Sequence, residues 1–299
     1  MKSSQRPLVI FDLDGTLVET AEDILAAINH VTASLGIAPL TMKNHRALVG
    51  FGGRHVIREA FRAADRQLTE GELEDIFRKF ISHYEANVAH HSRLFEGALE
   101  SLHRLRKTGH DVAICTNKST GPCRALLSAL QIDHLFCAIV ANDTFPWSKP
   151  DPPVLQATIN MAKADPARSI MVGDSRTDID AARAAGIPVI AVDFGYSDVP
   201  VRDLEPDRII PDFDTLYPAA RASRQILTAK HKRPRHENRA QAPCRHPRAR
   251  ILKIVLNQIL NLKLRGWLTI LIRYVSAHSG RMARRLPHPP QGDGFPTSF

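Results

Sequence analysis

Residues 7–16 read PLVIFDLDGT, and this stretch decides the fold. The four apolar residues at 8–11 predict a buried strand of a parallel sheet. Asp12 and Asp14 follow at alternate positions, and Gly15 then supplies a turn. Because ligands of open α/β sheets bind beyond the carboxyl ends of the strands, the two acids are expected to face a site. An Asp-Gly turn is also an ordinary strand end, so this stretch needs support from the rest of the chain.

Two patterns follow this strand along the chain. From Thr20, an expected helix N-cap, to about residue 91, apolar residues recur at three-to-four spacing and strand signals are few. Within this part, VGFGGRH at 49–55 predicts a Gly-rich turn that opens a helix. From Phe95 onward, helices alternate with short apolar strands, which we predict at 111–115, 135–140, 170–172 and 188–192. This alternation predicts a parallel sheet with right-handed crossovers.

Charge is divided unevenly along the chain. Residues 1–220 carry a formal net charge of −6 and residues 221–299 carry +15, which gives the +9 of the whole. The basic character therefore belongs to the C-terminal part and says nothing about a partner of the rest. Four cysteines without C-x-x-C spacing are expected to be thiols in a reducing compartment, and the apolar run at 8–11 is too short for a secretory signal. A cytoplasmic location is expected.

Four motifs occur in a fixed order: FDLDGTLVET, CTNKST, SKPDPP and VGDSRTDIDAARAAGIP. Together they resemble the haloacid dehalogenase superfamily and, within it, the phosphoglycolate phosphatases. The resemblance covers about two thirds of the chain, to about Pro218. Two details differ, because Glu19-Thr20 stands where Asp-Ser is more usual and Ser119 where a proline commonly follows TNK. They weaken the choice of phosphoglycolate over other small phosphates.

The resemblance implies an α/β fold, with a Rossmann-like parallel sheet core and a small all-α cap domain inserted after the first strand. We predict the core at 1–17 and 92–220 and the helical cap at 18–91. A basic, poorly ordered C-terminal tail is expected at 221–299. In this superfamily the cap covers the site and contributes to specificity.

The resemblance also assigns roles to four acids. Asp12 would be the nucleophile that forms an aspartyl-phosphate, and Asp14 the general acid and base. Mg²⁺ would be held by Asp12, Asp14 and Asp174, with Asp178 supporting the ion indirectly. An acidic cluster at a helix N-terminus is the ordinary alternative for Asp174 and Asp178. Dehalogenases and phosphonatases of this architecture lack an acid at position 14, so Asp14 favours phosphoryl transfer from an oxygen ester.

Five residues are candidates for contact with the substrate, three in the core and two in the Gly-rich turn. Thr116 and Asn117 would donate to the phosphoryl oxygens, and Lys149 would place a positive charge beside them. In the Gly-rich turn, backbone amides near Gly53 and the side chain of Arg54 would reach a second anionic group such as a carboxylate. The ordinary alternatives are turn residues or helix caps, a surface lysine, and an inter-helix turn with a solvated arginine.

These assignments predict a Mg²⁺-dependent phosphate monoester hydrolase that acts on a small phosphorylated metabolite, with 2-phosphoglycolate favoured. Sugar phosphatase, pyrophosphatase and phosphomutase activities of the same superfamily are the alternatives. No nucleic acid is needed for this catalysis. An alternative of a different class is a membrane- or nucleic-acid-binding protein that acts through its basic tail.

The C-terminal tail has two parts. Residues 230–250 are rich in Arg, His and Pro and are expected to be disordered. Residues 251–275 are largely apolar, but four cations interrupt them, so a transmembrane helix is not expected. Contact with an anionic membrane surface, contact with nucleic acid and a non-functional extension are the three interpretations. We favour the extension, because the motifs are complete without it.

Overall fold

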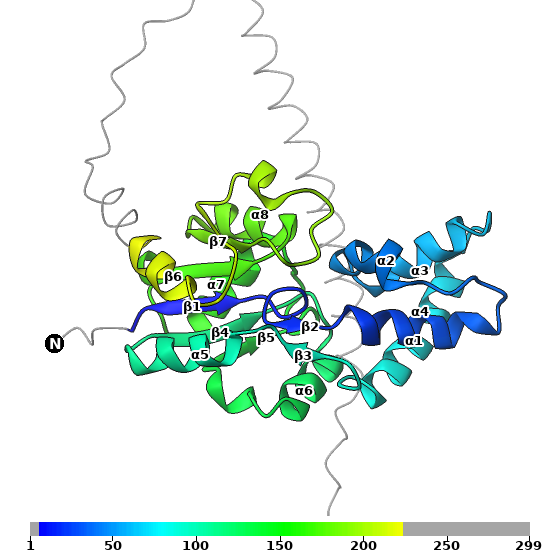
Figure 1. Cartoon of the computed structure of the whole chain (residues 1–299), viewed down its shortest axis with the longest axis horizontal. Coiled ribbons are helices and arrows are strands. Elements are labelled where there is room, and N and C mark those ends of the chain that lie inside the picture. Colours follow the sequence, from blue (N-terminus) through cyan, green and yellow to red (C-terminus); the bar gives the residue numbers. More distant parts are fainter. Residues whose placement is uncertain (1–5, 224–299) are drawn as a thin grey trace, which may run out of the picture. The chain divides into compact units, whose positions relative to one another are not determined.

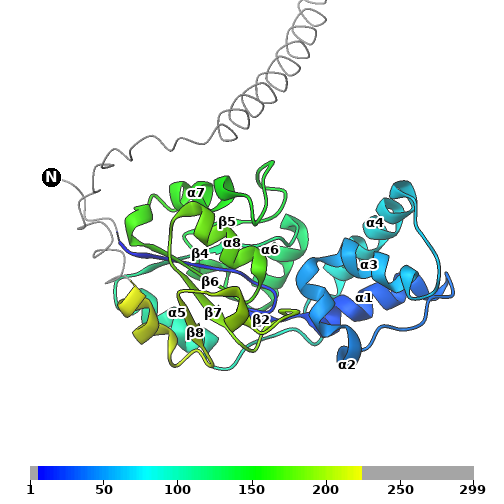
Figure 2. The same ribbon diagram turned by 90° about the horizontal axis from the view of Figure 1, so that it is seen from above.

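The computed structural model describes residues 6–223 (Figures 1 and 2). The expectations for the tail, namely disorder at 230–250, an interrupted apolar segment at 251–275 and contact with anionic surfaces, lie outside the described residues. No helix between residues 6 and 223 is long and apolar enough to cross a membrane.

A six-stranded parallel sheet forms the centre of the core, in the order β5-β4-β1-β6-β7-β8. Its strands are β1 (Leu8–Phe11), β4 (Asp111–Cys115), β5 (Ala138–Val140), β6 (Ser169–Gly173), β7 (Val189–Val192) and β8 (Arg208–Ile210). This is the doubly wound order, in which the winding direction reverses between β1 and β6. The predicted Rossmann-like core is confirmed.

Two strand predictions differ from the structure. The strand expected at 135–140 begins only at Ala138, because Leu135 is buried from a preceding 3-10 turn, η2 (Asp133–Leu135). β8 is not among the predicted strands, since it has three residues and buries only Ile210.

Both faces of the sheet are covered by helices, which is why β1 is apolar at every position. Val9 and Phe11 pack in the cluster that contains α5 (Ala98–Lys107) and α6 (Thr120–Ala129). Leu8 and Ile10 pack on the opposite face, with α7 (Pro152–Met161) and α8 (Arg176–Ala185). Short 3-10 turns, η3 (Pro166–Arg168) and η4 (Val201–Leu204), and a helical segment at 216–223 complete the core.

Helices α1 to α4 form the cap, apart from the sheet (Figure 2). They are α1 (Ala21–Ala33), α2 (Met42–His45), α3 (Gly53–Arg62) and α4 (Glu70–Ala86), with the 3-10 helix η1 (Arg46–Phe51) between α2 and α3. An antiparallel ribbon of β2 (Val18–Glu19) and β3 (Arg93–Leu94) carries the chain into and out of them. The inserted all-α cap is thus confirmed, whereas the residue limits of the domains stay a prediction.

The start of α1 differs in one respect from the prediction. Thr20 occupies the N-cap position, but its side chain does not cap the helix. Its hydroxyl donates instead to Asp14 Oδ1 at 2.7 Å. The amides of Thr20 and Ala21 donate to the hydroxyl of Tyr196, which belongs to the core. A distant tyrosine therefore caps the first cap helix.

Three of the four cysteines lie in the described residues. Cys115, Cys123 and Cys137 are free thiols, in line with the sequence prediction, and Cys244 lies outside the described residues. Burial raises the pKa of Cys115 to about 11, which keeps this thiol protonated beside the site.

Candidate active site

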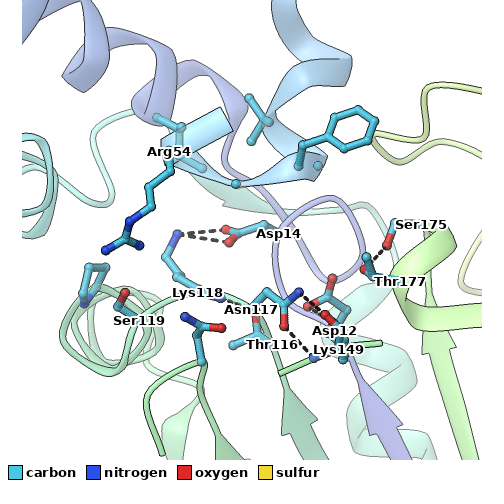
Figure 3. A pocket seen from close by; sticks show the side chains of 18 of the residues that line it. Asp12, Asp14, Arg54, Thr116, Asn117, Lys118, Ser119, Lys149, Ser175 and Thr177 are labelled. Atoms are coloured by element: carbon cyan, nitrogen blue, oxygen red, sulfur yellow. Dashed lines mark hydrogen bonds and ion pairs between the residues drawn. The ribbon is translucent and has the colours of Figure 1, made fainter. Parts of the chain in front are cut away.

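Three predicted site residues directly follow strands that are neighbours in the sheet. Asp12 follows β1, Thr116 follows β4 and Asp174 follows β6. β1 pairs with β4 on one side and β6 on the other along its whole length, so these three residues leave the sheet at the same level. The edge lies where the winding direction reverses, which is the usual position of a ligand site in such a sheet. Figure 3 shows Asp12 and Thr116 at the floor of the resulting cavity.

An acidic cluster lies at this edge. Carboxylate oxygens of Asp12, Asp174 and Asp178 lie within 4.8 Å of one another, and all three residues are buried. Burial raises the pKa of Asp12 to about 6, although the charge of Lys149 opposes part of the rise. Burial, and then the negative charges of Asp178 and Asp12, raise the pKa of Asp174 to about 8. The cluster therefore favours any cation that can stabilise its ionised form.

Lys149 is the ammonium group of this cluster. Its Nζ lies 2.9 Å from Asp12 Oδ1 and donates to Asp178 Oδ1 at 2.6 Å. Burial alone would lower its pKa, but the charges of Asp12 and Asp178 outweigh burial and raise it. The other oxygen of Asp178 accepts from the Ser175 hydroxyl at 2.6 Å in a capping box of α8. Asp178 thus orients Lys149 and the helix, and its predicted indirect support of a metal ion stays a prediction.

Asn117 occupies the site but holds another residue rather than facing the cavity with a free amide. Its Nδ2 donates to the Lys149 carbonyl at 2.9 Å, and its Oδ1 accepts from the Lys149 amide at 3.0 Å. Both ends of the side-chain amide thus fix Lys149. The amide nitrogen carries a second hydrogen, so the expected donation of Asn117 to a phosphoryl oxygen stays a prediction. Thr116 Oγ1 accepts from the Lys118 amide at 3.2 Å, which leaves its hydroxyl proton for donation.

Asp14 stands outside the acidic cluster, contrary to the expectation that its side chain joins Asp12 and Asp174. Its carboxylate lies beside Lys118 Nζ, at 2.9 and 3.2 Å (Figure 3). Thr20 donates to it as well, at 2.7 Å. The carboxylate is therefore turned toward Lys118 and Thr20, in a position that suits proton transfer at the cavity rather than a place in the acidic cluster.

Lys118 is a site residue that the sequence prediction missed. Its side chain is 5% exposed, and besides Asp14 it donates to the Tyr84 hydroxyl on α4 at 2.7 Å. Burial alone would lower its pKa, but the charges of Asp14 and Tyr84 and the hydrogen bonds to both together outweigh burial and raise it. The available signal was its place in CTNKST, directly after two residues assigned to the site.

Gly53 and Arg54 lie on the cap side of the cavity. Gly53 begins α3, and a Cβ there would come within 2.7 Å of Phe80 Cε1, so this close packing requires glycine. Arg54 is paired with Glu74 through Nε at 2.6 Å and Nη2 at 3.0 Å, and its guanidinium lies over the Phe77 ring. Figure 3 shows Arg54 pointing across the cavity toward the core. The structure thus brings Arg54 to the cavity, where its exposed guanidinium is paired with Glu74.

Core and cap together enclose a cavity of about 330 Å³. The core supplies its charged and polar wall, and the cap supplies a largely apolar one. The cap wall includes Ile24, Val49, Phe77, Phe80, Ile81 and Tyr84. The arrangement suits a small molecule with an anionic end at the core.

Comparisons with known proteins agree with this geometry. The family model of the haloacid dehalogenase-like hydrolases matches residues 9–192. A phosphoglycolate phosphatase of Mesorhizobium japonicum is 45% identical over 226 residues, which are 76% of this chain and 99% of that protein. One from Agrobacterium fabrum is 46% identical over 213 residues, 71% of this chain and 91% of its own.

Solved structures give the same result. A predicted phosphoglycolate phosphatase from Haemophilus somnus superposes with a TM-score of 0.67 at 31% identity, over 72% of this chain and 98% of that one. CbbY from Rhodobacter sphaeroides, solved in complex with phosphate, has a TM-score of 0.60 at 25% identity, over 71% and 96%. The chain therefore belongs to the haloacid dehalogenase-like hydrolases, and is a phosphatase similar to the phosphoglycolate phosphatases.

Proposed function

We propose that the protein hydrolyses 2-phosphoglycolate with the help of Mg²⁺, through an aspartyl-phosphate on Asp12. The observation that carries the proposal is the buried Asp12–Lys149 pair beside Asp174, at the edge where the sheet reverses its winding. The identity of 45% to a phosphoglycolate phosphatase along almost its whole length supports the choice of substrate.

The residues of the acidic cluster fit a divalent cation. Three buried carboxylates converge, and Lys149 supplies one ammonium to two of them. Among residues 6–223, the hydrogen bonds to the oxygens of Asp174 come from neutral donors, the Thr16 hydroxyl and the Tyr196 amide, both at 2.7 Å. An all-oxygen site with excess negative charge suits Mg²⁺. Asp12 and Asp174 would hold it, and when bound it supplies the positive charge that lets a phosphate dianion approach the carboxylates.

The chain's own residues divide the chemistry between two steps. In the first, a carboxylate oxygen of Asp12 attacks phosphorus, the ester P–O bond breaks, and Asp14 gives a proton to the leaving oxygen. In the second, water attacks phosphorus, Asp14 takes its proton, and the bond to Asp12 breaks to release phosphate. Lys118 and Thr20 both donate to Asp14 and hold its carboxylate in place at the cavity for the two proton transfers. Lys149 and the Thr116 hydroxyl would stabilise the phosphoryl oxygens.

Arg54 provides the argument for a substrate with a carboxylate. Glu74 engages its Nε and Nη2, whereas its Nη1 has no hydrogen bond to the described residues. This nitrogen remains for a carboxylate at the far end of the substrate. A cavity of about 330 Å³ suits a compact ester of this kind. The expected cytoplasmic location stays a prediction.

The test is phosphate release from 2-phosphoglycolate, a sugar phosphate and pyrophosphate, with Mg²⁺ or with a chelator. We expect release to be fastest from 2-phosphoglycolate, to require Mg²⁺, and to fall by about 10³-fold or more in Asp12→Asn. Asp180→Asn, an exposed carboxylate on α8, is the matched control. Faster release from another compound would keep the mechanism and reassign the substrate. An active Asp12→Asn variant would overturn the nucleophile.

A further inference from the structure

Tyr196 is a buried residue that the proposed chemistry does not use. It is 1% exposed and lies in the core loop after β7. Its hydroxyl accepts from the amides of Thr20 at 2.6 Å and Ala21 at 3.0 Å, and donates to Glu19 Oε1 at 2.6 Å. All of these partners belong to the segment where the chain enters the cap. The hydroxyl thus holds residues 19–21, where the chain enters the cap, against the core.

The opposite end of the same residue touches the acidic cluster. The Tyr196 amide donates to Asp174 Oδ2 at 2.7 Å, and the Thr16 hydroxyl donates to Oδ1 at the same distance. Both oxygens of Asp174 are therefore oriented by hydrogen bonds. One of these comes from the residue that also caps α1.

The cap reaches this loop from a second direction. Arg46, in η1, donates to the carbonyls of Gly195 at 2.7 Å and Phe194 at 3.0 Å, and its guanidinium lies over the Tyr196 ring. It is also paired with Glu19 at 2.7 Å. Glu19 and Arg46 are 14% and 31% exposed, so this pair is partly shielded from water. The loop at 194–196 is thus clamped by two separate parts of the cap.

Close packing makes this loop stiff toward Asp174. A Cβ on Gly195 would lie 2.2 Å from Asp174 Cβ, and a Cβ on Gly15 would lie 2.6 Å from Asp174 Oδ2 and 2.8 Å from the Tyr196 ring. No space separates the loop from the carboxylate. A shift of the loop would therefore displace Asp174 or break its hydrogen bond.

We propose that Tyr196, together with Glu19 and Arg46, couples the position of the cap on the core to the orientation of Asp174. When the cap contacts the loop at 194–196 as described, the loop holds Asp174 in the orientation that binds the metal. Metal binding in turn favours this position of the cap. The proposal rests on the proposed metal site. It assigns to Tyr196 a role in metal affinity without direct contact with the metal or the substrate.

The test is Mg²⁺ binding to Tyr196→Phe, measured by calorimetry, and Mg²⁺-dependent hydrogen exchange of residues 18–25 and 46–51. The variant keeps the ring and the amide that contacts Asp174, and loses only the hydroxyl. We expect a three- to tenfold weaker Mg²⁺ affinity, and faster exchange at 18–25 that Mg²⁺ no longer slows. Tyr217→Phe, in the core segment at 216–223 where its ring contacts Arg104, is the matched control and is expected to match wild type.

A second variant tests the coupling independently, in case Tyr196→Phe does not fold. Glu19→Gln can still accept from the Tyr196 hydroxyl but cannot form an ion pair with Arg46, so a weaker effect in the same direction is expected. Unchanged Mg²⁺ affinity in folded Tyr196→Phe overturns the coupling, whatever the enzyme hydrolyses. Should wild type bind Mg²⁺ but not hydrolyse 2-phosphoglycolate, the proposed function fails while the binding and exchange measurements still decide the coupling.

Discussion

The two walls of the active-site cavity are built by different rules. On the core wall, Asp12, Thr116 and Asp174 each follow directly after a strand, and the parallel sheet brings the strand ends together. On the cap wall, side chains come from separate helices, and packing between helices decides which of them face the cavity. The core wall therefore depends on topology, and the cap wall on packing. This difference predicts that substitutions in the core wall affect the chemistry and those in the cap wall affect the choice of substrate.

The largest effect is expected at Lys149, in the core wall. Lys149→Met keeps the aliphatic stem but removes the ammonium that holds Asp12 and Asp178. Two buried carboxylates then lose their partner, and the transferring phosphoryl group loses a positive charge. We expect kcat to fall by about 10³-fold, measured with saturating Mg²⁺. Lys107→Met, exposed at the end of α5, is the control. A loss below tenfold would show that the ammonium is not part of the reaction.

A smaller effect is expected at Lys118, where the two walls meet. Lys118→Met removes the ion pair with Asp14 and the hydrogen bond to Tyr84, whereas Tyr84→Phe removes only that hydrogen bond and keeps the ring beside Lys118. We expect kcat to fall by roughly 10- to 100-fold in the first variant, because Asp14 loses its charged partner, and by less than about threefold in the second. Equal losses would mean that the cap, and not the pairing with Asp14, carries the effect of Lys118.

The same division explains what the sequence could predict. The sequence predicts that Asp12, Asp174 and Lys149 converge, because each stands in a motif at the end of a strand or in the loop that follows one. The partners of these groups follow from tertiary packing. Nothing near Tyr196 in the sequence shows that its hydroxyl caps a helix that begins 175 residues earlier.

Two residues line the cavity as expected but contact other groups than the sequence predicts. The sequence predicts Asn117 in the site, and the residue lines the cavity, but its side-chain amide binds the Lys149 backbone. Asp14 was likewise placed at the cavity, but its carboxylate is turned to Lys118. Side-chain amides and carboxylates have several donors within reach in a crowded loop, and the sequence does not fix which donor is nearest. Position in the chain therefore predicts the neighbourhood, and the fold selects the partner.

On the cap wall, Arg54 is expected to affect binding rather than the chemical step. Arg54→Gln removes the charge proposed to meet the substrate carboxylate, so we expect the KM for 2-phosphoglycolate to rise about tenfold with kcat within about twofold. Arg58→Gln is a close control, because Arg58 lies on the same helix and forms a similar exposed pair with Glu70. An ester without a carboxylate, such as methyl phosphate, should be hydrolysed equally by wild type and Arg54→Gln. An equal rise in KM for both esters would contradict recognition of the carboxylate.

The smallest effect is expected on the stability of the metal-free protein, which should depend on pH through Asp174 in the core wall. The pKa of Asp174 is raised from 3.8 to about 8 in the folded protein, so between these values the folded state holds a proton that the unfolded state has lost. Stability in a chelator should therefore fall as the pH rises from 4 to 8. We expect a loss of at least about 1 kcal/mol between pH 6 and pH 8, or roughly 2–4 °C in Tm. Mg²⁺ should restore more stability at pH 8 than at pH 6, because it binds the ionised form.

Asp174→Asn isolates this contribution. The amide cannot ionise, so the decline in Tm between pH 6 and pH 8 should become flatter and Mg²⁺ should restore little, even if the variant is less stable at every pH through a lost hydrogen bond. Asp180→Asn, which alters an exposed carboxylate of α8, should keep the wild-type slope. Since the slope, and not the absolute Tm, carries the prediction, a general loss of packing cannot imitate the result. An unchanged slope in Asp174→Asn would show that Asp174 is ionised in the folded protein even without a metal, held by Thr16 and Tyr196 alone.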